Sequence, residues 1–475
     1  MKQPVNRLLL YALVAFVTVA AFQIGSRTRA YYQNVYPSSL SRSEMLGLKL
    51  MSAQKPTSAV SDVGEQSGEV DLQPMETFYR VLRALRENYV ERIEPTTERE
   101  MAHGALRAML ASLDDLDSRF LDSSAYEVIQ DQLRGKFHGI GAALAIRRAK
   151  EGGREITQLI VVTPMPGSPA EKSGLRAGDV ITHVDAKWLV SYDPYAEVNR
   201  LAKLARSGQA ERSALTRAYE AAQKKLENAT TATKAADTLT ANLRKDFILT
   251  VARSGEKLPL KIRVATGDTV LQPVSHRLLA GNVGYLDIGF FAEETPNEVA
   301  AALKDLAAQG ATKLVLDLRG CPGGSQESAL KAAAEIAPGR IVGVLRKAGN
   351  KEEVLKLGRP EDAGAWTRIV VLVDHSTAGM GELVAAGLRD SAGAVLVGEN
   401  SFGDARQRTV VPQKDDSAVI FTTGEYLSPK RYKYNEHGLT ATVKVAPTDS
   451  AEDAAVLKAL ELLSTPEPIR EVAHA

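Results

Sequence analysis

The fold is decided by the stretch IVVLVDHSTAGMGELVAAGL, which spans residues 369–388. The apolar run at its start predicts a buried strand, and the apolar run at its end predicts a helix. Many serine hydrolases hold their nucleophile where a strand breaks into a turn of small residues and then opens a helix. Backbone N–H groups at the start of that helix can receive an oxyanion. Gly379 stands in the middle of this turn, so the residue type at that position decides what the protein does.

Composition describes an ordinary soluble chain with room for several cores. The 475 residues are 44% hydrophobic and 25% charged, which predicts two to four domains. The formal net charge is +1, from 59 basic and 58 acidic residues, so no overall field favours a nucleic-acid partner. Cys321 is the single cysteine, which excludes an intrachain disulfide and a cysteine-based metal cluster.

The first residues predict a membrane anchor. Lys2 and Arg7 precede an apolar run over residues 8–22, which is short for a membrane span. No small-residue cleavage site follows closely, so we favour an uncleaved signal anchor over residues 1–30. The alternatives are a cleaved signal peptide and a buried N-terminal helix. The basic residues before the span place the bulk of the chain outside the cytoplasm, although Arg27 and Arg29 weaken that assignment. We expect a single-pass protein of the bacterial inner membrane with its bulk in the periplasm.

A linker and a helical region follow. Residues 31–74 are rich in Ser, Gln and Pro and predict a linker with one short helix at 41–51. Apolar residues recur at helical spacing between 75 and 90 and again between 97 and 113, which predicts a helical region over 75–130. The acidic cluster at 114–117 is interpreted as a solvated turn rather than a metal site, and no metal is expected elsewhere.

Glycines precede an alternating strand at GKFHGIGAALAI, residues 135–146. Such a loop can present N–H groups to a peptide's terminal carboxylate, and the strand edge can pair with the peptide. The run over 166–185, PGSPAEKSGLRAGDVITHVD, resembles the short helix, turn and strand of a PDZ domain. The resemblance implies a peptide-binding domain over 131–268. Its expected peptide-binding residues are Phe137, His138, Gly139, Ile140, Gly141 and Ala142.

A charged, Ala-rich segment over 195–247 interrupts the PDZ pattern. Helical spacing predicts two helices, inserted in or extending the helix that lines the peptide groove. The insertion either docks a partner or is a solvated decoration, and the sequence leaves both open. A hairpin over 247–264 closes the domain.

From residue 278 strands alternate with helices, which predicts an α/β domain over 269–465 and a short tail over 466–475. The predicted strands cover 283–288, 313–320, 369–373 and 394–398. The predicted helices cover 295–309, 325–336 and 451–463, and a hairpin turns at Asp415 and Asp416.

These segments, in this order, resemble the C-terminal processing (tail-specific) proteases of the S41 serine peptidases. The matching segments are 137–141, 168–185, 284–288, DLRGCPGG at 317–324, Ala378 with Glu382, 398–399 and SFG at 401–403. The resemblance covers about residues 75–463. It implies an α+β multidomain chain with a membrane anchor, a helical segment, a PDZ domain and a ClpP/crotonase-like α/β peptidase core.

The family is a serine/lysine protease in which a lysine of lowered pKa deprotonates the serine. When the family's glutamate is set on Glu382, the nucleophile's position holds Gly379. The family's lysine position holds Asp404, and the spacing of 25 residues is the family's own. The glutamine that follows the lysine by four residues is replaced by Arg408, with Gln407 one residue early.

Glycine carries no nucleophile, so we expect no catalytic residues and predict a pseudoenzyme that acts as a scaffold or regulator. Oxyanion-hole-like backbone is expected at Gly323, Gly324 and Met380. The PDZ domain would bind protein C-terminal peptides, and the insertion would support a homo-oligomer or an assembly with an active homologue. No cofactor is expected. The alternative is an active endopeptidase that cleaves near C-termini with a shifted nucleophile, Ser376 or Thr377.

Overall fold

A computed structural model describes residues 73–207, 211–360, 366–446 and 453–465, and the chain divides into two compact units at Phe120 and Leu121. The predicted anchor, the linker and the short helix at 41–51 lie outside the described residues. Within the described ranges, every helix is too short or too polar to span a bilayer.

The first unit contains the two helices that periodicity predicts, α3 (Gln73–Asn88) and α4 (Pro95–Ala111). Pro95 stands at the first position of α4, where the missing N–H costs no helical hydrogen bond. β1 (Arg119–Leu121) crosses the boundary between the units.

The PDZ part of the second unit is a seven-stranded sheet with β3 at one edge. β3 pairs with β4, and β5 pairs with β4, β6 and β8. The elements are α5 (Ser123–Leu133), β2 (Lys136–Phe137), β3 (Ala142–Glu151), β4 (Arg154–Pro164), α6 (Pro169–Lys172), β5 (Val180–Val184), β6 (Lys187–Leu189), β7 (Ala229–Thr230), β8 (Phe247–Ala252) and β9 (Leu260–Val264). An open edge at β3 is what strand addition by a peptide requires.

The described residues of the insertion form three helices, so the prediction of two was wrong. α7 (Ala196–Arg206) and α8 (Arg212–Glu227) form a hairpin, and α9 (Ala232–Thr240) follows after β7. Helical periodicity did not predict α9, because its sequence is rich in threonine, a weak helix former. The Thr231 hydroxyl accepts a hydrogen bond from the Lys234 N–H and so caps the start of α9. Ala232, Ala235 and Leu239 are buried in the PDZ core, so tertiary packing outweighs weak helix propensity.

The peptidase-like part is built on a six-stranded sheet in the order β11-β12-β13-β16-β17-β20. All neighbouring pairs are parallel except β11 with β12. The strands are β11 (Val274–Leu279), β12 (Val283–Ile288), β13 (Lys313–Asp317), β16 (Arg368–Val373), β17 (Val395–Gly398) and β20 (Val443–Lys444). β11 precedes the region in which the sequence predicts strands.

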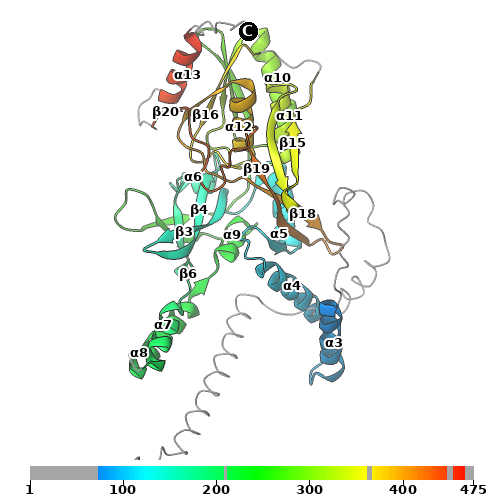
Figure 1. Cartoon of the computed structure of the whole chain (residues 1–475), viewed down its shortest axis with the longest axis vertical. Coiled ribbons are helices and arrows are strands. Elements are labelled where there is room, and N and C mark those ends of the chain that lie inside the picture. The colour runs from blue at the N-terminus through cyan, green and yellow to red at the C-terminus, as the bar shows by residue number, and fades with distance from the viewer. Residues whose placement is uncertain (1–72, 208–210, 361–365, 447–452, 466–475) are drawn as a thin grey trace, which may run out of the picture. The chain divides into compact units, whose positions relative to one another are not determined.

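Helices cover both faces of this sheet (Figure 1). α10 (Thr295–Ala308), α11 (Gln326–Ile336) and α12 (Met380–Ala392) share a core with one face, and α13 (Ala454–Ser464) packs on the other. Burial on both faces explains the continuous apolar runs of β13 and β16. The turn after β16 lies at the carboxyl end of this central strand, and α12 begins directly after the turn.

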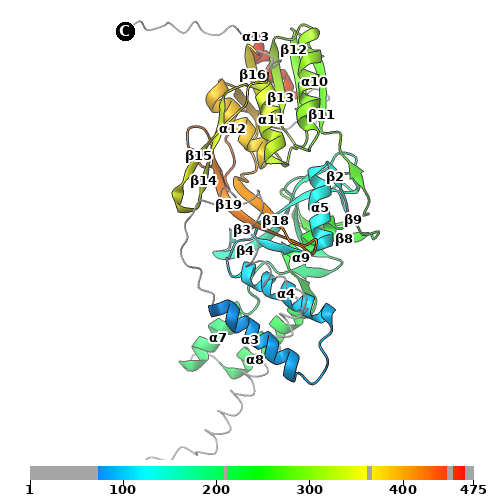
Figure 2. The ribbon, with the colours of Figure 1, turned by 90° about the vertical axis from the view of Figure 1, so that its right-hand side faces the viewer.

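A second sheet stands beside α12 (Figure 2). It contains β14 (Ile341–Lys347), β15 (Glu352–Lys356), β18 (Arg406–Pro412) and β19 (Ala418–Leu427), with a one-turn helix η1 (Ala348–Asn350) between β14 and β15. The predicted hairpin joins β18 to β19. β10 (Thr269–Val270) pairs with β2 and so ties the connector after the PDZ domain to the glycine-rich loop.

Candidate functional site

The turn between β16 and α12 has the backbone of a nucleophile elbow. Gly379 caps α12 with φ 53° and ψ −116°, a left-handed conformation that glycine adopts without strain. A Cβ at Gly379 would lie 3.4 Å from the Pro322 carbonyl oxygen and 3.7 Å from the Gly323 Cα. There is therefore space for a side chain at this position, and the chain supplies none.

The oxyanion-hole-like backbone predicted from the sequence lies next to Gly379. A Cβ at Gly323 would be 3.3 Å from the Met380 nitrogen and 3.7 Å from the Gly379 Cα. Gly324 is packed on Phe291, whose carbonyl oxygen would be 2.4 Å from a Cβ. Within the described part of the chain, the N–H groups of Gly323, Gly324 and Met380 donate no hydrogen bond. These N–H groups can donate hydrogen bonds to a ligand oxygen, but Gly379 places no hydroxyl opposite them.

Asp404 and Arg408 form a bidentate ion pair where the resemblance implies a lysine and a glutamine. Arg408 Nη1 lies 2.9 Å from Asp404 Oδ2, and Nη2 lies 2.9 Å from Oδ1. The side chains are 21% and 32% exposed, respectively, so the pair lies at the protein surface. The carboxylate is thus occupied by a cation rather than poised as a base.

Glu382 joins the elbow to the loop before β18. Its carboxylate is fully buried and accepts hydrogen bonds from the Gly379, Gly403 and Asp404 N–H groups at 3.1, 2.6 and 2.7 Å. The Ser401 hydroxyl donates a fourth, at 2.5 Å. Burial raises the pKa of Glu382 to about 7. The hydrogen-bond donors act in the opposite direction, because they favour the ionised carboxylate. Glu382 therefore ties the turn at Gly379 to the loop at Gly403 and Asp404.

Ser376 and Thr377, the alternative nucleophiles, make hydrogen bonds that stabilise the turn. The Thr377 hydroxyl is fully buried, donates to the Leu318 carbonyl at 2.8 Å, and accepts from the Asp374 N–H at 3.0 Å. The Ser376 N–H donates to the Asp374 carboxylate at 3.0 Å. His375 is exposed and its Nδ1 lies 3.1 Å from Glu399, so it does not activate Ser376.

Gln407 belongs to a different network from Asp404. Its amide donates to the Gln326 side chain at 3.0 Å and accepts from the Thr423 hydroxyl at 3.1 Å. A bulge follows it, because Gln407 pairs with Gly424 while Arg408 pairs with Thr422. The early glutamine therefore does not take the place that Arg408 occupies.

Cys321 is fully buried, and burial raises the pKa of its thiol to about 12. The thiol thus stays protonated and packs as a small apolar side chain beside the elbow.

The glycine-rich loop gathers all six predicted peptide-binding residues at the start of β3. Phe137 packs edge-on against Phe290 with ring centroids 5.3 Å apart. His138 is buried between two carboxylates, with Nε2 2.7 Å from Asp131 and Nδ1 2.7 Å from Asp268. Burial lowers the pKa of His138, but the two carboxylates outweigh burial and leave the pKa raised. The His138 ring therefore links the loop to Asp131 and Asp268 through both of its nitrogens.

Sequence reasoning missed Arg147, which links β3 to the loop at Phe402 and Gly403. Its guanidinium lies 3.5 Å from the centroid of the Phe402 ring and donates to the Phe402 and Gly403 carbonyls at 2.5 and 3.0 Å. Its neighbours lie about 255 positions away in sequence, so no local pattern could have found the contact.

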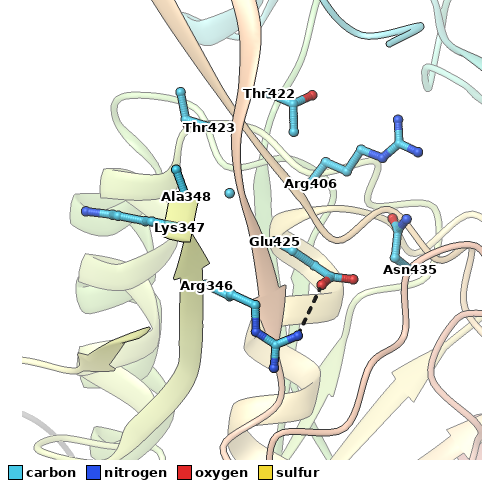
Figure 3. Close-up of a pocket in the computed structure, with 9 residues that line it drawn as sticks. Arg346, Lys347, Ala348, Arg406, Thr422, Thr423, Glu425 and Asn435 are labelled. Carbon is cyan, nitrogen blue, oxygen red and sulfur yellow. Dashed lines mark ion pairs between the residues drawn. The ribbon is translucent and has the colours of Figure 1, made fainter. Parts of the chain in front are cut away.

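A pocket of about 300 Å³ lies near this site (Figure 3). Asn435 connects the two, because its side chain lines the pocket and accepts from the Ala405 N–H at 3.1 Å. Each cation that lines the pocket is paired with a carboxylate: Arg346 lies 3.7 Å from Glu425, Lys347 lies 2.6 Å from Glu353, and Arg406 lies 3.6 Å from Glu436. The pocket thus offers no uncompensated charge to a ligand.

Comparison with known proteins fits this geometry. A family model described as peptidase family S41 matches residues 282–445, and one described as PDZ domain matches residues 160–204. The chain carries an S41 peptidase domain and a PDZ domain. Both were predicted from the sequence.

Relatives and a solved structure agree with the two domains. The chain is 27% identical over 396 residues to a carboxyl-terminal-processing protease of Synechocystis sp., covering 80% of each chain. It is 26% identical over 395 residues to the carboxy-terminal processing protease CtpA of Bacillus subtilis, covering 82% of this chain and 73% of that protein. The solved photosystem II D1 C-terminal processing protease aligns with a TM-score of 0.57 at 23% identity, covering 79% of this chain and 94% of that one. The last likeness shows the fold alone.

Proposed function

We propose that this chain is a cell-envelope S41-type protein that does not cleave peptide bonds and acts as a scaffold or regulator. The observation that carries the proposal is Gly379 at the elbow, with an intact backbone around it and no hydroxyl. The Asp404–Arg408 ion pair supports it, because no lysine stands where a serine would need one.

The PDZ domain binds exposed protein C-termini by strand addition to β3 in this proposal. The open edge of β3 and the glycine-rich loop before it support that assignment. Assembly with an active homologue through the α7–α8 hairpin, and anchoring of residues 1–30 in the inner membrane with the bulk in the periplasm, belong to the same proposal.

The alternative is an endopeptidase with a shifted nucleophile. Thr377 is poorly suited, since its hydroxyl already makes hydrogen bonds within the turn. Ser376 is buried, and within the described residues no lysine side chain hydrogen-bonds to either hydroxyl. Nothing in the geometry favours this alternative.

A serine-directed fluorophosphonate probe tests the proposal. The purified full-length chain should remain unlabelled, with and without C-terminal peptides present, while an active S41 protease is labelled in parallel. Labelling that Ser376→Ala or Thr377→Ala removes would establish the alternative and sink the proposal.

A further inference from the structure

The glycine-rich loop would need free N–H groups to hold a peptide's carboxylate. In this structure the Ile140 N–H donates to the Leu239 carbonyl at 2.9 Å, and the Gly141 N–H donates to the His138 carbonyl at 3.3 Å. Leu239 is the last residue but one of α9, the helix that packs beside β3. A backbone carbonyl of the chain itself therefore stands where the resemblance to PDZ domains implies a ligand oxygen.

The contact leaves no gap for a ligand. A Cβ built on Gly139 would lie 2.0 Å from the Leu239 carbonyl oxygen, so the end of α9 rests directly on the loop backbone. Other segments fix the carbonyls of the loop. The Ala170 N–H donates to the Ile140 carbonyl at 2.8 Å, and the Gly267 N–H donates to the Gly139 carbonyl at 2.8 Å. The loop itself is thus fixed, and α9 is the element that has to move.

The C-terminal end of α9 is weakly anchored, so it can move away from the loop. The last four carbonyls of a helix have no partner within the helix. In α9 one of these, the Leu239 carbonyl, accepts its hydrogen bond from the Ile140 N–H. The helix spans only nine residues and ends at Ala241 in an extended conformation. Its other buried side chains are alanines, Ala232 and Ala235, so the fully buried Leu239 side chain is its main anchor.

A carboxylate is the ligand chemistry that can displace this carbonyl. Hydrogen bonds to an ionised acceptor are about twice as strong as those between neutral groups. The displaced Leu239 carbonyl can turn to water, so the exchange leaves no buried polar group unpaired.

We propose that the end of α9 closes the carboxylate-binding loop in the free chain, and that a C-terminal peptide binds only after this end withdraws from Ile140. The inference rests on the peptide-binding half of the proposed function and is independent of the proteolytic half. Because only the open fraction binds, closure weakens the apparent affinity by that fraction.

Stopped-flow binding to the full-length chain tests the inference. The probes are fluorescein-labelled decapeptides ending in Ala, Val, Leu or Phe, each as free acid and as C-terminal amide. The acids should bind at least about tenfold more tightly than the amides. The observed association rate should rise to a plateau with peptide concentration, which marks opening before binding. A rate that stays linear up to saturation would overturn the inference while leaving peptide binding intact.

Two matched variants test whether the end of α9 is the element that closes the loop. Leu239→Ala removes the anchor of α9, whereas Leu249→Ala removes an equally buried leucine on β8 in the same core. Leu239→Ala should tighten binding of the acids by about three- to tenfold and raise the plateau rate, and Leu249→Ala should do neither. An equal response of the two variants, or no binding to any chain, would contradict the inference. The kinetics of the unmodified chain decide the question if either variant fails to fold.

Discussion

The guanidinium of Arg408 holds the carboxylate of Asp404 through two hydrogen bonds of 2.9 Å. The pair occupies the positions of the lysine and glutamine that the S41 resemblance implies. The carboxylate and the guanidinium at these two positions therefore form a complementary pair.

Breaking this pair should have a modest effect. Arg408→Ala should lower the free energy of unfolding by about 0.5–1 kcal/mol, since the pair is partly exposed and water replaces its hydrogen bonds. Urea denaturation measures the change, with Arg200→Ala as a control at the more exposed pair with Glu197. A gain of proteolysis in Arg408→Ala would contradict the interpretation of a structural pair.

Rebuilding the lost groups should restore nucleophile chemistry. The triple variant Gly379→Ser, Asp404→Lys, Arg408→Gln should react with a fluorophosphonate probe, because the elbow has space for a Cβ and the oxyanion backbone is present. Serine at φ 53° costs about 1–2 kcal/mol of stability. Gly379→Ser alone should label far more weakly, since it lacks the lysine. Equal labelling of the unmodified chain would contradict the account.

Removing the Glu382 carboxylate should disorganise both halves of the site. Glu382→Ala leaves four donors unpaired in a buried environment and should cost about 3 kcal/mol or more in free energy of unfolding. Glu382→Gln keeps one acceptor oxygen and should cost less. Thermal and urea denaturation check the order of the two variants, and a neutral Glu382→Ala would show that the network is not formed.

Stability should depend on pH through His138. Both ring nitrogens face carboxylates at 2.7 Å, so only the imidazolium can donate both hydrogen bonds. The pKa of His138 is raised by Asp131 and Asp268, so its contribution is fully present below about pH 6.5 and is lost as pH rises through the folded-state pKa. Unfolding curves from pH 5.5 to 8.5 should show this loss in the native chain and not in His138→Gln. Parallel curves for the two proteins would rule it out.

Order and spacing in the sequence were enough to locate the strand, turn and helix around Gly379, and they predict that Gly379, Asp404 and Arg408 take the positions of the family's catalytic residues. The apolar run of β16, the glycine turn and the helix after it are local features, and the interval from Gly379 to Asp404 supports the alignment at both ends. The PDZ loop was found in the same way, from glycines that precede an alternating strand.

The remaining features depend on contacts between distant residues. Asp268 reaches His138 across 130 positions, and Arg147 reaches Phe402 across 255. α9 was missed because its residues are weak helix formers whose burial stabilises the helix. Such packing is set by the whole fold, and no window of sequence displays it.

Substituting the fallback nucleophiles should separate structure from chemistry. Thr377→Ala should lower the free energy of unfolding by about 1–3 kcal/mol, because it removes the acceptor of the Asp374 N–H and one of the two donors to the buried Leu318 carbonyl, to which the Cys321 N–H also donates. Ser376→Ala should cost less. Neither should change the rate of peptide cleavage above a buffer blank, and a rate that falls in either variant would identify that hydroxyl as reactive.

Absence of proteolysis is the central claim, and mass spectrometry of a peptide library tests it most directly. The purified full-length chain is incubated with decapeptides bearing free C-termini, beside the triple variant and an active S41 protease. The account predicts intact peptides with the native chain. Specific cleavage by the native chain that Ser376→Ala or Thr377→Ala abolishes would contradict it.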